Sequence, residues 1–178
     1  MSQVKKIVIA AVCAALGIVL PMAFHSIPNA GSVWLPMHIP VLISGLVAGP
    51  VSGLATGILA PVLSSVLTGM PPAPILPSMA CELAVYGLVA GLLSHVVRTG
   101  KLSADLYLSL AGAMVAGRVV GGILQALVFS AGKYSLAAWA TGYFVTGLPG
   151  IVLQLAVVVP IVVSLERAGL VPSRYPRA

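Results

Sequence analysis

Long apolar runs, separated by short polar segments, make up most of the chain. Strict alternation of apolar and polar residues is absent, so the pattern favours helices over strands. Each of the five clearest runs is close to the ~20 residues that a helix needs to cross a bilayer. They cover residues 4–24, 51–68, 77–97, 106–130 and 144–165.

A sixth run, residues 36–48, is shorter and ends at Gly49-Pro50, which is a turn signal. If it crosses the membrane, both termini share one side, and Lys133 is the one basic residue outside the runs on the other side. Basic loops are retained in the cytosol. We therefore predict an all-α membrane protein, a single transmembrane domain over residues 1–178 with six helices and both termini cytosolic.

The composition agrees with a membrane location. Hydrophobic residues make up 60% of the sequence and charged residues 7%, whereas soluble proteins carry about 25% charged residues. The net charge of +6 then indicates topology rather than a nucleic-acid partner. The sequence contains no GxxxxGK(S/T) phosphate loop, and neither a nucleophile triad nor a metal-ligand cluster stands out. We expect no enzyme activity and no cofactor.

Two ionisable residues lie well inside the predicted spans, Glu82 and Arg118. A charge at the centre of a bilayer costs at least about 2.5 kcal/mol, so each needs a partner or a function. Tyr86 follows Glu82 by four residues and shares its helix face. Gln125 follows Arg118 by seven residues, and the glycines between them are expected to leave a hollow.

Two interpretations of these polar residues stay open. Glu82 and Arg118 could form a buried ion pair, with the glutamines holding helices together. Alternatively, a polar pocket opens to the outer side, where the loops 25–38, 69–78 and 131–143 carry the proline, glycine and aromatic residues of a lid. Arg118 would then suit a carboxylate or phosphate of the ligand. The candidate substrate-binding residues are Glu82, Arg118, Gln125, Gln154, His38, Tyr86, Trp34 and Tyr143.

The run at residues 4–24 carries small residues at helical spacing. Ala10 and Ala14 form one small-xxx-small pair, and Ala11 and Ala15 form another. Such pairs let helix backbones approach closely. We therefore expect a partner protein to dock on this alanine ridge, next to the predicted cytosolic end.

Several stretches resemble a known family: LPMHIPVLISGLVAGPVSGL, LAPVLSSVLTGMPP, CELAVYGLVAGLL, GRVVGG and LPGIVLQ. With six short helices, an alanine ridge and no ATPase motif, the chain is similar to the substrate-binding S-components of energy-coupling factor (ECF) vitamin transporters. The resemblance covers nearly the whole chain and is closest to the pantothenate-type (PanT-like) branch.

The resemblance implies a high-affinity binding subunit for uptake of a vitamin or related micronutrient, with pantothenate as the best guess, in a prokaryotic cell membrane. The alanine ridge would contact a transmembrane T-component, which couples to two cytosolic ATPases. The bundle would topple in the membrane to carry its ligand inward. Two alternatives stay open: an S-component for another vitamin, and a stand-alone secondary transporter that uses Glu82.

Overall fold

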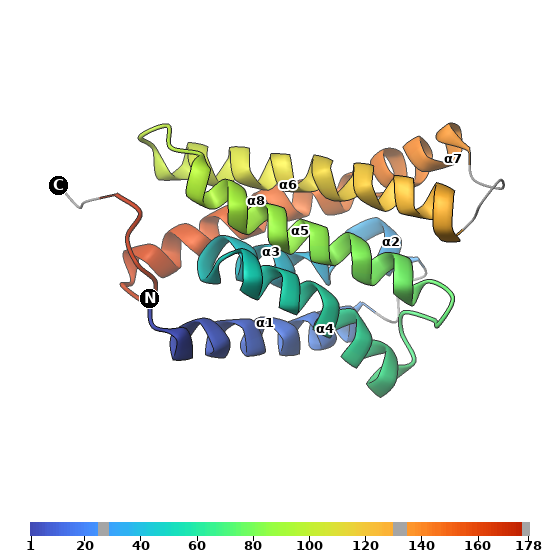
Figure 1. Cartoon of the computed structure of the whole chain (residues 1–178), viewed down its shortest axis with the longest axis horizontal. Coiled ribbons are helices and arrows are strands. Elements are labelled where there is room, and N and C mark those ends of the chain that lie inside the picture. Colours follow the sequence, from blue (N-terminus) through green and yellow to red (C-terminus); the bar gives the residue numbers. More distant parts are fainter. Residues whose placement is uncertain (25–28, 130–134, 176–178) are drawn as a thin grey trace.

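The computed structural model describes residues 1–24, 29–129 and 135–175, and every regular element in these ranges is helical (Figure 1). Six spans in this part of the chain are long and apolar enough to cross a membrane, which confirms the expected all-α fold. The spans are α1 (Gln3–Ala23), α2 (Ala30–Trp34) with α3 (His38–Ala48), α4 (Pro50–Thr68), α5 (Leu76–Val96), α6 (Leu102–Leu124) and α8 (Leu148–Arg167). The shorter elements are α7 (Leu136–Ala140) and two π-helical turns, η1 (Gln125–Phe129) and η2 (Thr141–Thr146).

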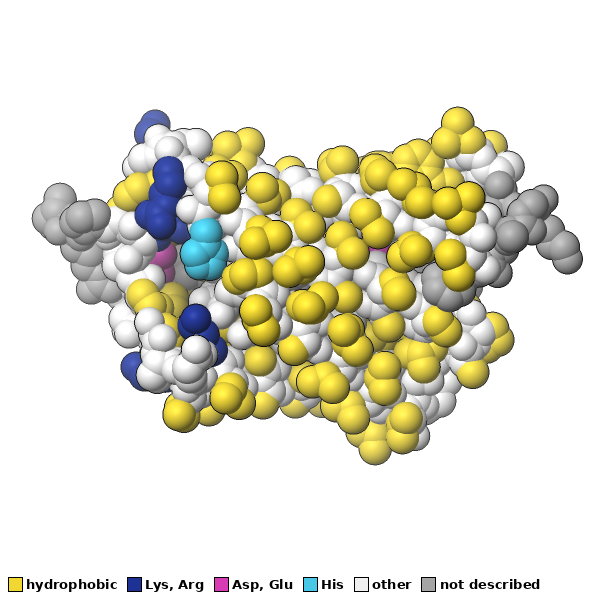
Figure 2. Space-filling model, in the orientation of Figure 1, with side chains coloured by type: hydrophobic (Ala, Val, Ile, Leu, Met, Phe, Trp, Pro, Cys, Tyr) yellow, Lys and Arg dark blue, Asp and Glu magenta, His cyan; other side chains and the backbone are white. Residues whose placement is uncertain are grey.

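The two ends of the bundle differ in character. The start of α1 and the end of α8 lie at one end, which we call the terminal end, whereas α2 and α7 lie at the opposite, outer end (Figure 1). Figure 2 shows hydrophobic side chains over the middle of the molecule and Lys and Arg side chains gathered at the terminal end. This distribution is the one that the positive-inside rule associates with a cytosolic face.

The short helix α3 lies at the centre of the bundle. It contacts α1, α4, α5 and α8, and its Leu42 is fully buried. The hydroxyl oxygens of Ser44 on α3 and Thr56 on α4 are 2.8 Å apart, a hydrogen bond that pairs two polar groups inside the bundle. Gly49 then adopts a φ of +99° and Pro50 starts α4, so the two helices join directly at the predicted turn.

Glycines let α3, α4 and α5 touch along their backbones. A Cβ on Gly87 of α5 would collide with the backbone of Gly53 on α4, and a Cβ on Gly57 of α4 with the backbone of Leu83 on α5. Gly45 of α3 meets the backbone of Gly87 in the same way. Lipid is as apolar as the helix surfaces, so the hydrophobic effect does not drive helices together within a bilayer. Close packing of the backbones supplies the attraction instead.

Helix α6 begins at Leu102 and continues through η1, whereas the sequence pattern predicted a span over residues 106–130. The difference concerns Asp105, which the prediction left in the preceding loop. Its side chain is fully buried and accepts hydrogen bonds from the backbone N–H and the hydroxyl of Thr99, each at 2.7 Å. These bonds satisfy the carboxylate in the first turn of α6, where a negative charge also favours the helix dipole.

Candidate functional site

Polar residues predicted for the outer side converge between α3 and α5. His38 is the first residue of α3, and its Nε2 atom lies 3.9 Å from Oε1 of Glu82 on α5. The ring of Tyr86 stands edge-on to the His38 ring, with centroids 5.0 Å apart. His38 and Tyr86 are buried, and the Glu82 side chain is 15% exposed. The helix face shared by Glu82 and Tyr86 therefore meets His38.

Glycines on α6 bring this face of α5 against α6. A Cβ on Gly117 would lie 2.6 Å from Cδ2 of Tyr86, which is too close for any side chain. A Cβ on Gly121 would lie 3.2 Å from Cγ of Glu82 and 3.3 Å from Oη of Tyr143. Tyr86 and Glu82 therefore occupy space that glycine leaves open, and Tyr143 of η2 reaches the same place.

Arg118 of α6 is 2% exposed, and aromatic residues surround it. Its guanidinium carbon lies 5.4 Å from the ring centroid of Phe144, within the range of a cation–π contact. Trp139 of α7 donates its indole N–H to the carbonyl oxygen of Arg118 at 3.0 Å. The Trp139 ring also packs against Gly122. It therefore fills the hollow that the sequence predicted between Arg118 and Gln125.

Glu82 and Arg118 do not pair directly. Within the described residues, the one ion-pair contact of Glu82 is to His38, and no Arg118 nitrogen lies within 4.0 Å of a carboxylate. Tyr143 lies between them, because Gly121 faces both Glu82 and the Tyr143 hydroxyl, and Gly147 faces both Arg118 and the Tyr143 backbone. Opposite charges thus face one small region without neutralising each other. We call this group the outer polar cluster: His38, Glu82, Tyr86, Arg118 and Tyr143.

Several buried polar atoms of the candidate residues have no hydrogen-bond partner in the described part of the chain. They are Tyr86 Oη, Arg118 Nε, His38 Nδ1 and both side-chain amide atoms of Gln154, which is fully buried on α8. An unpaired buried polar atom costs about 1–3 kcal/mol. A ligand that supplies these hydrogen bonds would gain affinity. The arrangement suits a small molecule with an anionic group and several hydroxyl or amide groups.

Two of the predicted site residues are not part of the outer polar cluster, and two residues beside Arg118 were not predicted from the sequence. Trp34 on α2 is 37% exposed, and its side chain has no hydrogen bond or ring contact among the described residues. Gln125 is half-buried at the start of η1. Trp139 and Phe144 were not predicted as site residues, although the aromatic content of the segment that contains them was visible in the sequence.

One of the three predicted lid segments can be followed closely. Residues 69–75 are tied to the end of α4, because Ser64 Oγ donates to the carbonyl of Met70 at 2.7 Å and Ser65 Oγ to that of Pro71 at 2.8 Å. Residues 25–28 and 131–134, which belong to the other two segments, lie outside the described residues. The role of these loops as lids stays a prediction.

The two alanine pairs of α1 face in different directions. Ala14 is 8% exposed and packs into the bundle together with Gly17, and Ala10 is half-buried. Ala11 and Ala15 are exposed. One of the two predicted pairs is therefore taken up largely by contacts within the chain, while the other lies on the outer surface of α1.

Most of the chain matches a known protein family. Residues 5–162 match the family described as "ECF transporter, substrate-specific component". No match is found among curated proteins, and none among solved structures. The matched range includes the whole outer polar cluster and both alanine pairs. The chain therefore belongs to the family of substrate-specific components of ECF transporters, the membrane subunits that bind the transported molecule.

Proposed function

We propose that this chain is the high-affinity binding subunit through which an ATP-driven ECF transporter takes up a vitamin or related micronutrient. Family membership supports a substrate-binding role. The observation that carries the proposal is that Glu82 and Arg118 lie on either side of Tyr143 without pairing, beside buried polar atoms that lack hydrogen-bond partners in the described part of the chain. Charges inside a membrane bundle are costly, and a polar ligand explains why these two are held apart.

Pantothenate is the substrate that we propose. Its single carboxylate suits Arg118, because a guanidinium binds carboxylates through strong charge-assisted hydrogen bonds. Its hydroxyl and amide groups suit Tyr86 Oη and the Gln154 amide, which lack hydrogen-bond partners within the described residues. Tyr143 offers aromatic surface to its carbon chain. A vitamin with a cationic ring would instead place its charge beside Glu82.

Native mass spectrometry of the purified protein identifies the substrate, because tightly bound ligands co-purify. Calorimetric titration of the ligand-free protein with pantothenate then measures its affinity. We expect a co-purified mass equal to that of pantothenate and saturable binding. Binding of a different vitamin would overturn the choice of pantothenate and leave the binding role intact. Absence of binding to any small molecule would overturn both.

We further propose that the exposed pair Ala11 and Ala15 meets a transmembrane T-component, which couples to two cytosolic ATPases. Exposed small residues let a partner helix approach closely, whereas Ala14 is buried within the bundle. The terminal end would then face the cytosol of a prokaryotic cell, in line with the basic side chains gathered there (Figure 2).

A second candidate function is a stand-alone secondary transporter driven by protons. The 3.9 Å contact between His38 and Glu82 favours it, because neighbouring ionisable side chains inside a membrane bundle often form proton relays in transporters. Proteoliposomes separate the two functions. Concentrative uptake by this protein alone under a proton gradient would establish the secondary transporter. Uptake that requires the T-component, the ATPases and ATP would establish the ECF mechanism.

A further inference from the structure

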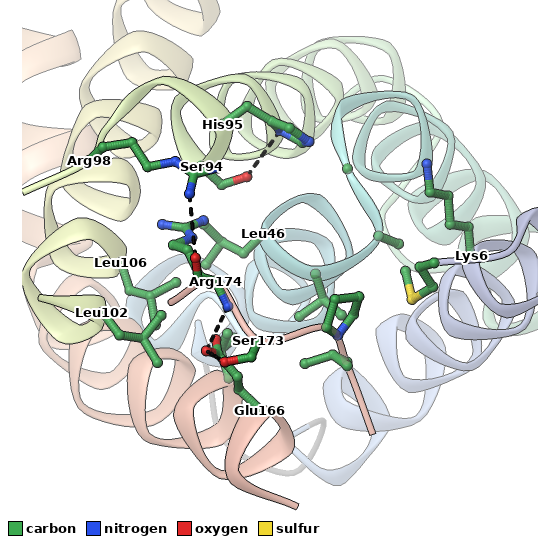
Figure 3. Close-up of a pocket in the computed structure, with 17 residues that line it drawn as sticks. Lys6, Leu46, Ser94, His95, Arg98, Leu102, Leu106, Glu166, Ser173 and Arg174 are labelled. Carbon is green, nitrogen blue, oxygen red and sulfur yellow. Dashed lines mark hydrogen bonds between the residues drawn. The ribbon is translucent and has the colours of Figure 1, made fainter. Parts of the chain in front are cut away.

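A cavity of about 310 Å³ lies at the terminal end of the bundle, opposite the outer polar cluster (Figure 3). Helices α1, α3, α5, α6 and α8 contribute to its walls, and residues 171–174, which follow α8, form one side. In Figure 2, Lys, Arg and His side chains lie at this end of the molecule. The basic residues that line the cavity are Lys6, His95, Arg98 and Arg174.

The segment 171–175 is fixed across the end of the bundle. The backbone N–H of Arg174 donates to Oε1 of Glu166 at 2.8 Å. The hydroxyl of Tyr175 donates to the buried carboxylate of Asp105. These bonds tie the segment to α8 and to α6. Arg174 is therefore held in the cavity wall before any ligand binds.

The cavity lining carries an excess of positive charge. Glu166 is its acidic residue, and the Arg174 backbone already occupies one of its carboxylate oxygens. Asp105 lies 3.7 Å from the Arg174 guanidinium but does not line the cavity. Lys6 and Arg98 have no carboxylate within 4.0 Å among the described residues. Their charges are not neutralised within that part of the chain.

The guanidinium of Arg174 also has hydrogen-bonding capacity in reserve. Its Nη1 atom is buried and has no hydrogen-bond partner in the described part of the chain, since the contact to Asp105 is too long to count as one. Figure 3 shows this side chain next to Arg98, whose Nη1 atom donates to the Arg174 carbonyl at 3.5 Å. Lys6 of α1 lines the opposite side of the cavity from Arg98 and Arg174 (Figure 3). The three cationic side chains therefore come from three different parts of the sequence.

We propose that this basic cavity binds the phosphate group of an anionic phosphate ester. A phosphate accepts several charge-assisted hydrogen bonds at once, and a fixed guanidinium together with a mobile ammonium can supply them. The cavity lies where α1 begins and α5 ends, which is the depth of lipid headgroups. Basic pockets between membrane helices at this depth bind anionic headgroups. A phospholipid is therefore the expected source of the phosphate.

Basic residues also gather on this side of a membrane protein to set its topology, but topology does not require them to line one cavity. Lys5 and Lys101 illustrate the difference. Both are exposed at the terminal end, and neither lines the cavity. Replacing them removes the same charge from the same end of the molecule, so they provide a matched control.

The test compares two double variants. The cavity variant carries Lys6→Gln and Arg98→Gln, and the control variant carries Lys5→Gln and Lys101→Gln. Native mass spectrometry measures binding of phosphatidylglycerol and of net-neutral phosphatidylcholine, and a thermal shift measures binding of glycerol phosphate. We expect the wild type and the control to prefer phosphatidylglycerol. We expect the cavity variant to bind it about thirtyfold more weakly, from the loss of two basic contacts.

The outcomes show which molecule carries the phosphate and whether the proposal fails. Binding of phosphatidylglycerol alone identifies a lipid, and comparable binding of glycerol phosphate identifies a soluble ester. An equal loss in both double variants, or no loss in either, would show that general surface charge attracts the lipid and would overturn the proposal. If the cavity variant does not fold, Arg98→Gln alone, at an exposed side chain, replaces it in the same comparison.

Discussion

Arg118 is positioned by its neighbours, yet part of its guanidinium stays unpaired. Trp139 holds its backbone carbonyl and Phe144 lies against its charge, while Nε has no hydrogen-bond partner in the described part of the chain. Among the described residues, the one ion-pair contact of Glu82 is the 3.9 Å contact to His38. A site whose charged groups are oriented before the ligand arrives loses less entropy on binding. The outer polar cluster, the substrate site that we propose, has this property.

Replacing Arg118 by alanine is expected to weaken substrate binding at least about tenfold, because a hydrogen bond to a charged group contributes about 1.5 kcal/mol or more. The affinity of Arg118→Lys should lie between those of the wild type and of Arg118→Ala, since lysine keeps the charge but lacks the planar guanidinium. Calorimetry with the substrate that co-purifies measures both variants. Lys5→Ala, at an exposed residue of the terminal end, is the control. Unchanged affinity in a folded Arg118→Ala protein would make Arg118 a structural residue.

At the scale of the helices, glycines let the backbones of α4 and α5 touch where the two helices cross. Gly53 and Gly57 of α4 face the backbone of α5, and Gly87 of α5 faces that of α4. The same arrangement brings α5 close to α3 through Gly45. Because α5 also carries Glu82, its position determines where the outer polar cluster forms.

The change Gly87→Ala is expected to destabilise the bundle by about 1–3 kcal/mol, the cost of overpacking a close-packed interface. Its new Cβ would collide with the backbone of Gly53, which has no flexible side chain to move. Gly31→Ala on α2 is the matched control, because a Cβ there meets nothing within 4 Å. Thermal unfolding in detergent measures the difference. Equal melting temperatures for the two variants would refute the close contact.

The buried carboxylate of Asp105 is one of the groups that anchor the segment after α8. Tyr175→Phe removes the hydroxyl that donates to Asp105, and loss of a hydrogen bond to a buried charged group costs about 1–3 kcal/mol. We expect faster proteolysis of this segment and a lower melting temperature. Tyr107→Phe, at a residue of α6 that is 43% exposed, should change neither. Equal protection of the segment in both variants would count against its anchoring by Tyr175.

At the scale of the whole molecule, the polar features are divided between the two ends. The outer polar cluster involves the start of α3, α5, α6 and η2, toward the end with α2 and α7, and the basic cavity lies at the terminal end (Figure 3). Helix α1 runs along the edge of the bundle, where it contacts α3 and α4. Its other side exposes Val8, Val12 and Val19 beside the pair Ala11 and Ala15. This side is open to lipid or to a partner helix.

Introducing leucine at Ala11 and Ala15 together is expected to preserve substrate binding and to abolish transport by the assembled transporter, because large side chains prevent close approach of a partner helix. Ala14→Leu should instead lower the stability of the isolated protein, since Ala14 is buried. Ala111→Leu, at an exposed alanine of α6, should change neither. Binding assays with the isolated protein and uptake assays with the complete transporter measure these effects. Retained transport in the Ala11 and Ala15 variant would remove this face from the interface.

The amino-acid sequence was sufficient for the fold class and for a set of candidate polar residues. A bilayer sets the length of a span and makes charges rare within it, so the six spans and the unusual positions of Glu82 and Arg118 follow from local patterns. The shared face of Glu82 and Tyr86 also follows, because both belong to one helix with a known period. Family similarity over residues 5–162 agrees with this reading.

Contacts between helices could be found only in the folded molecule. Glu82 meets His38 rather than Arg118, Trp139 fills the space beside Gly122, and Ala15 faces outward. Each of these results depends on how far one helix is rotated and shifted against another. Local sequence patterns specify the period of a helix but not its rotation, which results from packing between residues far apart in the chain.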